Sequence, residues 1–154
     1  MMRNGRLSWL LVFVFLGVCS GARGEVRQST NGEQYAGTYS GTWDGSGSGN
    51  FELTLEKGKD KDGGVTGRVA VTTDAGNYTA AFKALSFEDN KMNAKYDFPL
   101  DPSASSEVVL MATVEGSIVK GTWSLRPKGQ EAEVAKGTWT VTKKSGEGGR
   151  KANP

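Results

Sequence analysis

GTYSGTW, residues 37–43, ends in a tripeptide that returns at residues 121–123 and again at 137–139. These three copies of Gly-Thr-Trp hold every tryptophan of the chain except Trp9. Residues two apart lie on the same face of a β-strand, so glycine and tryptophan share one face and threonine takes the other. The glycine leaves room there for a neighbouring ring. The tripeptide therefore predicts three strands that turn their tryptophans towards a common core.

Short segments of period two continue along the chain and are separated by glycine, aspartate and asparagine, which is typical of strands and hairpins. They cover residues 37–43, 50–57, 65–73, 78–84, 92–98, 107–114, 119–125 and 137–141. The alternation predicts inner faces that include Tyr39, Phe51, Leu53, Val69, Tyr78, Ala84 and Phe98. The short connections favour an antiparallel meander, and pairing the last strand with the first removes both exposed edges. The three strands that carry Gly-Thr-Trp are consecutive neighbours only with this pairing, so the repeat also predicts it. We predict an all-β fold, an eight-stranded antiparallel up-and-down meander closed into a small barrel over residues 36–143. A flat two-sheet sandwich is the alternative.

The first 24 residues have the pattern of a secretory signal peptide. Arg3 and Arg6 precede an uncharged apolar run, residues 7–18, which is too short to cross a bilayer comfortably. Small residues follow and suit a cleavage site at 18–20 or 22–24. We expect residues 1–24 to be removed on export, which places the mature protein in the periplasm or outside the cell.

Cys19 is the single cysteine of the chain and lies in this leader. The stretch Leu16-Gly17-Val18-Cys19 resembles a bacterial lipobox, in which the cysteine is lipidated, although Val18 departs from the pattern. A plain leader cysteine is the default, and a lipid anchor through Cys19 is the alternative. In both cases the folded domain keeps no thiol for a disulfide or for nucleophilic catalysis.

Charge argues against nucleic acid as a partner. Residues 1–24 hold three of the 19 basic residues and no acid, which leaves 16 basic and 17 acidic residues and a net charge of −1. We expect a polar linker over residues 25–35, a disordered basic tail over 144–154 and no transmembrane span in the mature chain.

The chain contains no histidine, which excludes Ser-His-Asp and Cys-His catalysis and ordinary zinc sites. A carboxylate-based hydrolase is the enzymatic alternative, with pairs such as Asp97 and Asp101, or Glu52 and Glu56, although the latter two lie on a polar strand face. Residues 59–64, KDKDGG, resemble part of a calcium loop but lack its distal glutamate. Asn77-Tyr78-Thr79 is an N-glycosylation pattern. We expect no catalytic residue, no metal and no cofactor.

Gly41-Thr42-Trp43, followed by a glycine-serine turn and FELTL at 51–55, resembles the opening of avidin-like and lipocalin-like (calycin-type) secreted barrels. The lipocalin resemblance implies that Trp43 plugs one end of the barrel and that an arginine, Arg126 or Arg68, covers it. The avidin resemblance implies an asparagine and a serine just after the opening tryptophan. Gly45 and Gly49 stand in those places, with Ser46 and Ser48 nearby, so biotin is not the expected ligand.

The rings of the inner face either fill the barrel or line a pocket for a small apolar or amphipathic ligand. The candidate lining residues are Tyr39, Trp43, Phe82, Met92, Tyr96, Trp123 and Trp139. The leading hypothesis is an exported, non-enzymatic β-barrel that binds such a ligand. The alternative is a cell-envelope protein-protein interaction module with a filled core. Its contact surface is the outer face of residues 107–114, which we assign to Val108, Leu110, Ala112 and Val114.

Overall fold

The computed structural model describes residues 32–59 and 64–146. This part of the chain contains one short 3-10 helix and nine strands. They are η1 (Gly32–Tyr35), β1 (Gly37–Gly45), β2 (Ser48–Lys57), β3 (Val65–Thr73), β4 (Gly76–Ala81), β5 (Ala84–Glu88), β6 (Lys91–Asp97), β7 (Ser106–Glu115), β8 (Ile118–Pro127) and β9 (Ala135–Lys143). The signal peptide, Cys19, most of the linker and residues 147–154 of the predicted tail lie outside the described residues, as do residues 60–63 of the calcium-like loop.

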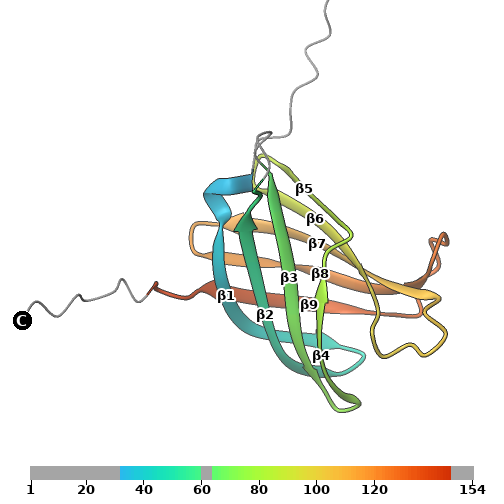
Figure 1. Cartoon of the computed structure of the whole chain (residues 1–154). Coiled ribbons are helices and arrows are strands. Elements are labelled where there is room, and N and C mark those ends of the chain that lie inside the picture. Colours follow the sequence, from blue (N-terminus) through green and yellow to red (C-terminus); the bar gives the residue numbers. More distant parts are fainter. Residues whose placement is uncertain (1–31, 60–63, 147–154) are drawn as a thin grey trace, which may run out of the picture.

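The nine strands form one antiparallel sheet in the order β4-β3-β2-β1-β9-β8-β7-β6-β5. The sheet curls into a half-barrel, so that β1–β4 cross over β5–β9 with the core between them (Figure 1). The first strand pairs with the last, with Trp43 opposite Trp139 and Gly41 opposite Val141. This pairing was predicted from the tripeptide and is confirmed. A single sheet also means that the two-sheet sandwich is wrong.

Nine strands replace the predicted eight because the segment 78–84 divides at Phe82. The Phe82 N–H donates to Gly67 O of β3, whereas the next N–H, that of Lys83, donates to Lys95 O of β6. The chain thus changes partner strand within one residue. Lys83 and Ala84 both face solvent, so the inward face moves to Leu85 and Phe87. Assigning Ala84 to the inner face was therefore wrong, because period two fails across a partner switch.

The core follows the predicted inner faces on the other strands except β7, whose buried face is described with the site below. Tyr39, Leu53, Val69 and Val141 are examples with almost no exposed surface. Each comes from a different strand of the half-barrel, and each occupies an inward position of the alternation. Burying one face of every strand is what a curled antiparallel sheet requires, because its other face meets water.

Helix η1 closes one end of the half-barrel. The Tyr35 ring packs on Phe87 of β5 with ring centres 5.1 Å apart, and the Tyr39 hydroxyl donates to Tyr35 O at 2.7 Å. A Cβ on Gly32 would lie 2.2 Å from the Phe87 ring, so glycine lets the chain approach this closely. The last four residues of the predicted linker 25–35 are therefore packed on the barrel end. The opposite end carries the functional candidate.

Candidate functional site

The open end of the half-barrel holds an apolar hollow of about 380 Å³, which we call the cup. The turns β1–β2 and β3–β4 and the loops β6–β7 and β8–β9 meet at this end, since alternate connections of a meander lie on the same side. The cup is lined by Trp43, Ser46, Gly47, Ser48, Phe51, Val71, Thr73, Asp74, Ala75, Tyr78, Tyr96, Phe98, Leu100, Val108, Leu110, Trp123, Leu125 and Ala135. Its size lies within the range of small-molecule sites.

Two tryptophans wall the cup with fixed rings. Trp43 and Trp123 meet edge to face, with ring centres 5.4 Å apart and an interplanar angle of 86°. The Trp43 indole N–H donates to Thr72 O at 2.9 Å, and the Trp123 indole N–H donates to Asp44 O at 3.0 Å. Both rings are half-buried although their N–H groups are already satisfied. They therefore offer a ligand ring faces and edges but no hydrogen-bond donor.

Glycines explain how these rings reach carbonyls two strands away. Trp43 stands opposite Gly49 of β2 and donates to β3, while Trp123 stands opposite Gly137 of β9 and donates to β1. A Cβ on Gly49 would lie 2.8 Å from the Trp43 Nε1 atom, and one on Gly137 would lie 2.7 Å from that of Trp123. The rings cross the middle strand where it has no side chain. This confirms that glycine makes room for a ring and assigns the Gly137 copy to Trp123.

Two tyrosines meet below these walls. The hydroxyls of Tyr78 and Tyr96 are 3.1 Å apart, and the Tyr78 ring packs edge to face on Phe98. Burial raises the pKa of Tyr96 well above its ordinary value, and the neighbouring Tyr78 raises it further. Burial also raises the pKa of Tyr78. Both phenols are therefore neutral at physiological pH. They add to the interior of the cup a polar point that can donate or accept a hydrogen bond.

Asp101 holds the β6–β7 loop, from which Phe98 and Leu100 reach the cup. Its carboxylate accepts the Ser103 N–H at 2.9 Å and the Ser105 N–H at 3.1 Å. Hydrogen bonds, first from Ser103 and then from its serine neighbours, keep the pKa of Asp101 well below its ordinary range. The charged carboxylate thus fixes the loop that carries one rim of the cup.

The structure brings three of the seven predicted lining residues together in the cup, namely Trp43, Tyr96 and Trp123. Tyr39, Met92 and Trp139 are at most 1% exposed and belong to the packed core. Phe82 lies over Gly67 and packs on Tyr96 from outside the cup. These four residues therefore do not line the cup. Alternation identifies an inward face but does not say how far along the barrel axis a residue lies.

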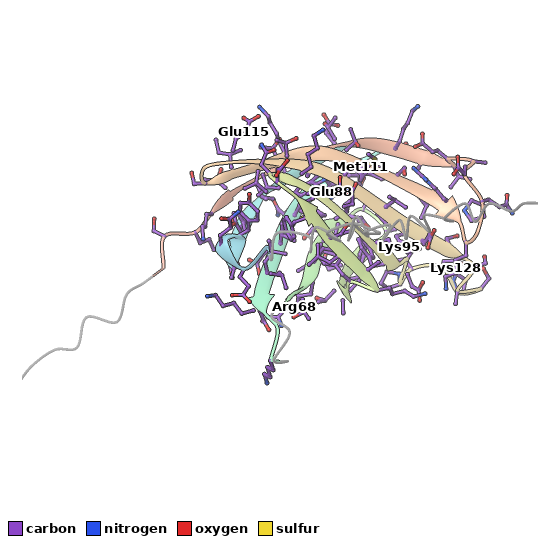
Figure 2. The ribbon with its side chains drawn as sticks, turned by 90° about the horizontal axis from the view of Figure 1, so that it is seen from above. Arg68, Glu88, Lys95, Met111, Glu115 and Lys128 are labelled. Carbon is purple, nitrogen blue, oxygen red and sulfur yellow. The ribbon has the colours of Figure 1, made fainter. Side chains whose placement is uncertain are left out.

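The predicted outer face of residues 107–114 was also wrong. Val108, Leu110, Ala112 and Val114 are buried in the core, and the first two line the cup. The outward side chains of β7 include Met111, which is 54% exposed, is labelled in Figure 2 and stands opposite Asn93 of β6 and Thr122 of β8. Both faces of this segment are apolar in sequence, so only the neighbouring strands decide which one is covered. The proposed contact surface is therefore lost.

Several residues that line the cup were not among the seven predicted lining residues. Phe51, Tyr78 and Phe98 had been placed on inner faces without a site role, and their positions before or after turns were the available signal. Leu100 had no signal, because it lies in a loop whose path depends on Asp101. Ser46 and Ser48, which follow the opening tryptophan in sequence, line the mouth and can offer hydroxyl groups there.

The remaining candidates lie away from the cup lining. Arg68 pairs with Glu56 at 3.4 Å, and Arg126 donates to the Ser124 hydroxyl and pairs with Glu133. Among the described residues, the cation-π contact found is that of Lys143 over Tyr39, so neither arginine covers Trp43 in this way. Asp97 binds Lys83 and Lys128, at 3.0 Å each. In residues 32–59 and 64–146 no three histidine, cysteine or acidic side chains form a metal-binding group.

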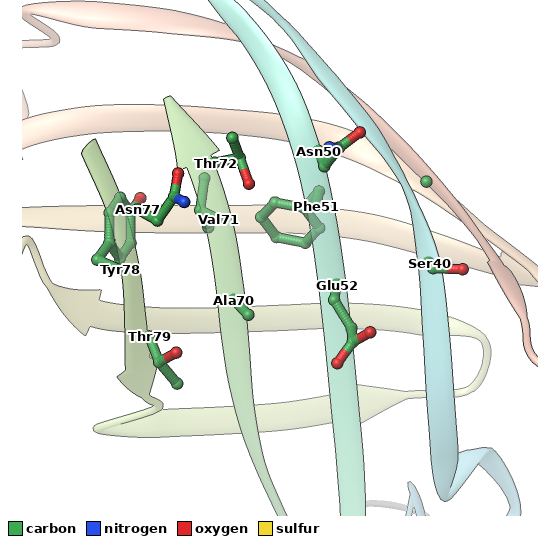
Figure 3. Close-up of a pocket in the computed structure, with 11 residues that line it drawn as sticks. Ser40, Asn50, Phe51, Glu52, Ala70, Val71, Thr72, Asn77, Tyr78 and Thr79 are labelled. Carbon is green, nitrogen blue, oxygen red and sulfur yellow. The ribbon is translucent and has the colours of Figure 1, made fainter. Parts of the chain in front are cut away.

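A broader hollow of about 700 Å³ lies on the outer face of β1–β4 (Figure 3). Most of its outward side chains are short and polar, and the acid Glu52 and Ala70 lie among them; the polar ones are Ser40, Asn50, Thr72, Asn77 and Thr79. The glycosylation pattern falls here, with Asn77 and Thr79 both exposed. This hollow is larger than the cup, but it follows the open curvature of the sheet and lacks enclosing aromatic walls. We therefore place the candidate ligand site in the cup.

Comparison with protein-family models and with curated protein sequences finds no match to this chain. Within the part of the chain that the structure describes, no helix is long and apolar enough to span a bilayer. What the cup can bind thus follows from its own shape and chemistry.

Proposed function

We propose that the protein is an exported, non-enzymatic binding protein that holds a small apolar or amphipathic molecule in the cup. The observation that carries this proposal is the wall formed by Trp43 and Trp123. Their rings are fixed by backbone hydrogen bonds and yet remain half-buried around a hollow of about 380 Å³. A preformed apolar site loses little conformational entropy when a ligand enters.

The half-barrel supports a calycin-type reading of the fold. In this proposal β4 and β5 count as one strand, which changes its partner at Phe82 and closes an eight-stranded barrel through the chain itself. The successive hydrogen bonds of Phe82 to β3 and of Lys83 to β6 support it. So does the packing of Tyr35 of η1 on Phe87 at the end of the half-barrel opposite the cup.

Export rests on the leader pattern of residues 1–24. Its test is the intact mass of the protein recovered from its native host, which should correspond to a first residue between 19 and 25. A lipid anchor through Cys19 would add acyl mass and would be abolished by Cys19→Ser. Recovery of the unprocessed chain would contradict export.

The test of ligand binding is fluorescence of the neutral apolar probe N-phenyl-1-naphthylamine. We expect its emission to rise in the presence of the purified protein. Val108→Phe adds a ring inside the cup and should suppress this rise, whereas Val109→Phe adds the same ring on the outer side of β7 and should not. Circular dichroism checks that both variants fold. Probe binding that is absent in the wild type, or equal in all three proteins, would contradict the proposal and favour a filled module.

A further inference from the structure

The cup lining contains a single charged side chain. Of the residues that form it, Asp74 is the one acid, and neither lysine nor arginine takes part. Asp74 lies in the β3–β4 turn, two residues after Thr72, whose carbonyl accepts the Trp43 indole N–H. The carboxylate therefore sits at the Trp43 side of the mouth, beside an aromatic wall.

The basic side chains on the flanking strands are engaged elsewhere. Lys83 and Lys128 are both 3.0 Å from Asp97, while Arg126 and Lys136 are 3.4 and 3.5 Å from Glu133. Among the described residues Asp74 itself forms no ion pair. Clefts lined by one sign of charge and apolar walls concentrate the field of that charge. The one charge that belongs to the cup lining itself is therefore negative.

The aromatic walls of the cup also favour a positively charged ligand. The faces of tryptophan and tyrosine rings attract a cation through their quadrupole, and tryptophan does so best. The indole N–H groups of Trp43 and Trp123 are consumed by backbone carbonyls, so they are not donors for an anion. A ligand carboxylate would meet Asp74 and the neutral hydroxyls of Ser46 and Ser48 at the mouth, aromatic faces along the walls and one pair of neutral phenols within, but no cationic side chain of the lining.

We propose that the ligand is an amphipathic organic cation, whose apolar body fills the cup and whose ammonium group lies at the mouth between Asp74 and Trp43. This inference rests on the proposed function, since it assigns the charge of the molecule that the cup holds. A neutral amphiphile binds more weakly because it lacks the interaction with Asp74. An anionic one binds weakest, because it is repelled there.

Three probes with the same ten-carbon chain test the charge preference: decyltrimethylammonium, decanol and decanoate, each below its micelle concentration. Tryptophan emission of the purified protein reports binding at the cup. We expect the cation to bind about tenfold more tightly than decanol and decanoate to bind least. Decanoate binding as tightly as the cation would overturn the inference and leave the proposed function intact. Failure of all three, decanol included, would overturn both.

Asp74→Asn removes the charge at nearly constant shape, and Asp74 lies in an exposed turn, so the fold should persist. This variant should bind the cation and decanol with similar affinity, while its affinity for decanol stays unchanged. Glu88→Gln is the matched control, because it removes the same charge from an exposed site at the η1 end. If Glu88→Gln weakens cation binding as much as Asp74→Asn does, the preference comes from overall charge and the assignment of Asp74 is wrong.

Discussion

The substitution Gly137→Ala tests the reason why the chain repeats Gly-Thr-Trp. A Cβ at this position would lie 1.8 Å from Asp44 O, 2.7 Å from the Cα of Gly45 and 2.7 Å from the Trp123 Nε1 atom. Two of these three atoms are backbone, so a side-chain rotation cannot relieve the contact. Strand β1 has to move away from β9 by more than 1 Å, and the hydrogen bond from Trp123 to Asp44 O is lost with it.

The expected cost follows from these two effects. Forcing a methyl group into a packed site costs about 1–3 kcal/mol. Loss of the indole hydrogen bond adds about 1 kcal/mol. The free energy of unfolding should therefore fall by about 2–4 kcal/mol, out of about 5–15 kcal/mol for a typical domain. For a domain of about 100 residues this lowers Tm by roughly 10–25 °C.

Urea unfolding followed by circular dichroism measures this change. Gly64→Ala is the control, because a Cβ there meets no atom within 4 Å, and it should stay within about 0.5 kcal/mol of the wild type. If Gly137→Ala is as stable as Gly64→Ala, the close approach of β1 to β9 is not what selects glycine. The explanation of the repeat would then be refuted.

Three further predictions concern the core and two titrating groups. Leu110→Ala should cost about 2–5 kcal/mol in urea unfolding, whereas Met111→Ala on the other face of β7 should cost less than about 0.5 kcal/mol; the reverse order would restore the outer-face assignment. Because the pKa of Asp101 is lowered in the folded protein, its contribution to stability is present above the unfolded value of about 3.9 and is lost as pH falls through the folded pKa. In a plot of Tm against pH, Asp101→Asn should reduce the fall of Tm at acidic pH. An unchanged fall would contradict the role of the carboxylate. Because the pKa of Tyr96 is raised, its contribution is present below about pH 10 and is lost as pH rises towards the folded pKa. Tyr96→Phe should reduce the alkaline loss of stability, and equal profiles for both proteins would count against a buried neutral phenol.

The alternation of side chains predicted most of the fold because burial on one face is a local property. Tyr39, Leu53 and Val69 were placed correctly from their own strands, and the Gly-Thr-Trp copies identified the pairing of β1 with β9. A close glycine-ring contact needs two neighbouring strands, so a repeated motif of this kind carries information on pairing. This is more than propensity alone supplies.

The errors arise where non-local contacts decide. Ala84 follows a partner switch at Phe82, which no alternation reveals. Val108 and Leu110 lie in a strand that is apolar on both faces, so its orientation is chosen by β6 and β8.

The site was predicted less completely than the fold. To line a pocket, a residue must lie on the inner face and also at the right position along the barrel axis, and alternation predicts only the face. Trp139 and Trp123 share a motif and an inward face, yet one is fully buried and the other walls the cup. Their difference comes from register, since Trp139 lies opposite Gly121 and its indole N–H donates to Thr122 O of the adjacent strand. Trp123 reaches a carbonyl two strands away, at the rim.

The indole N–H signals in a two-dimensional ¹⁵N–¹H NMR spectrum test the central claim most directly. Trp43 and Trp123 wall the cup, whereas Trp139 is 1% exposed and lies outside it. On addition of N-phenyl-1-naphthylamine, the signals of Trp43 and Trp123 should shift together while that of Trp139 stays in place. Unmoved signals from Trp43 and Trp123 under conditions where the probe binds, or an equal shift of Trp139, would contradict the cup as the binding site.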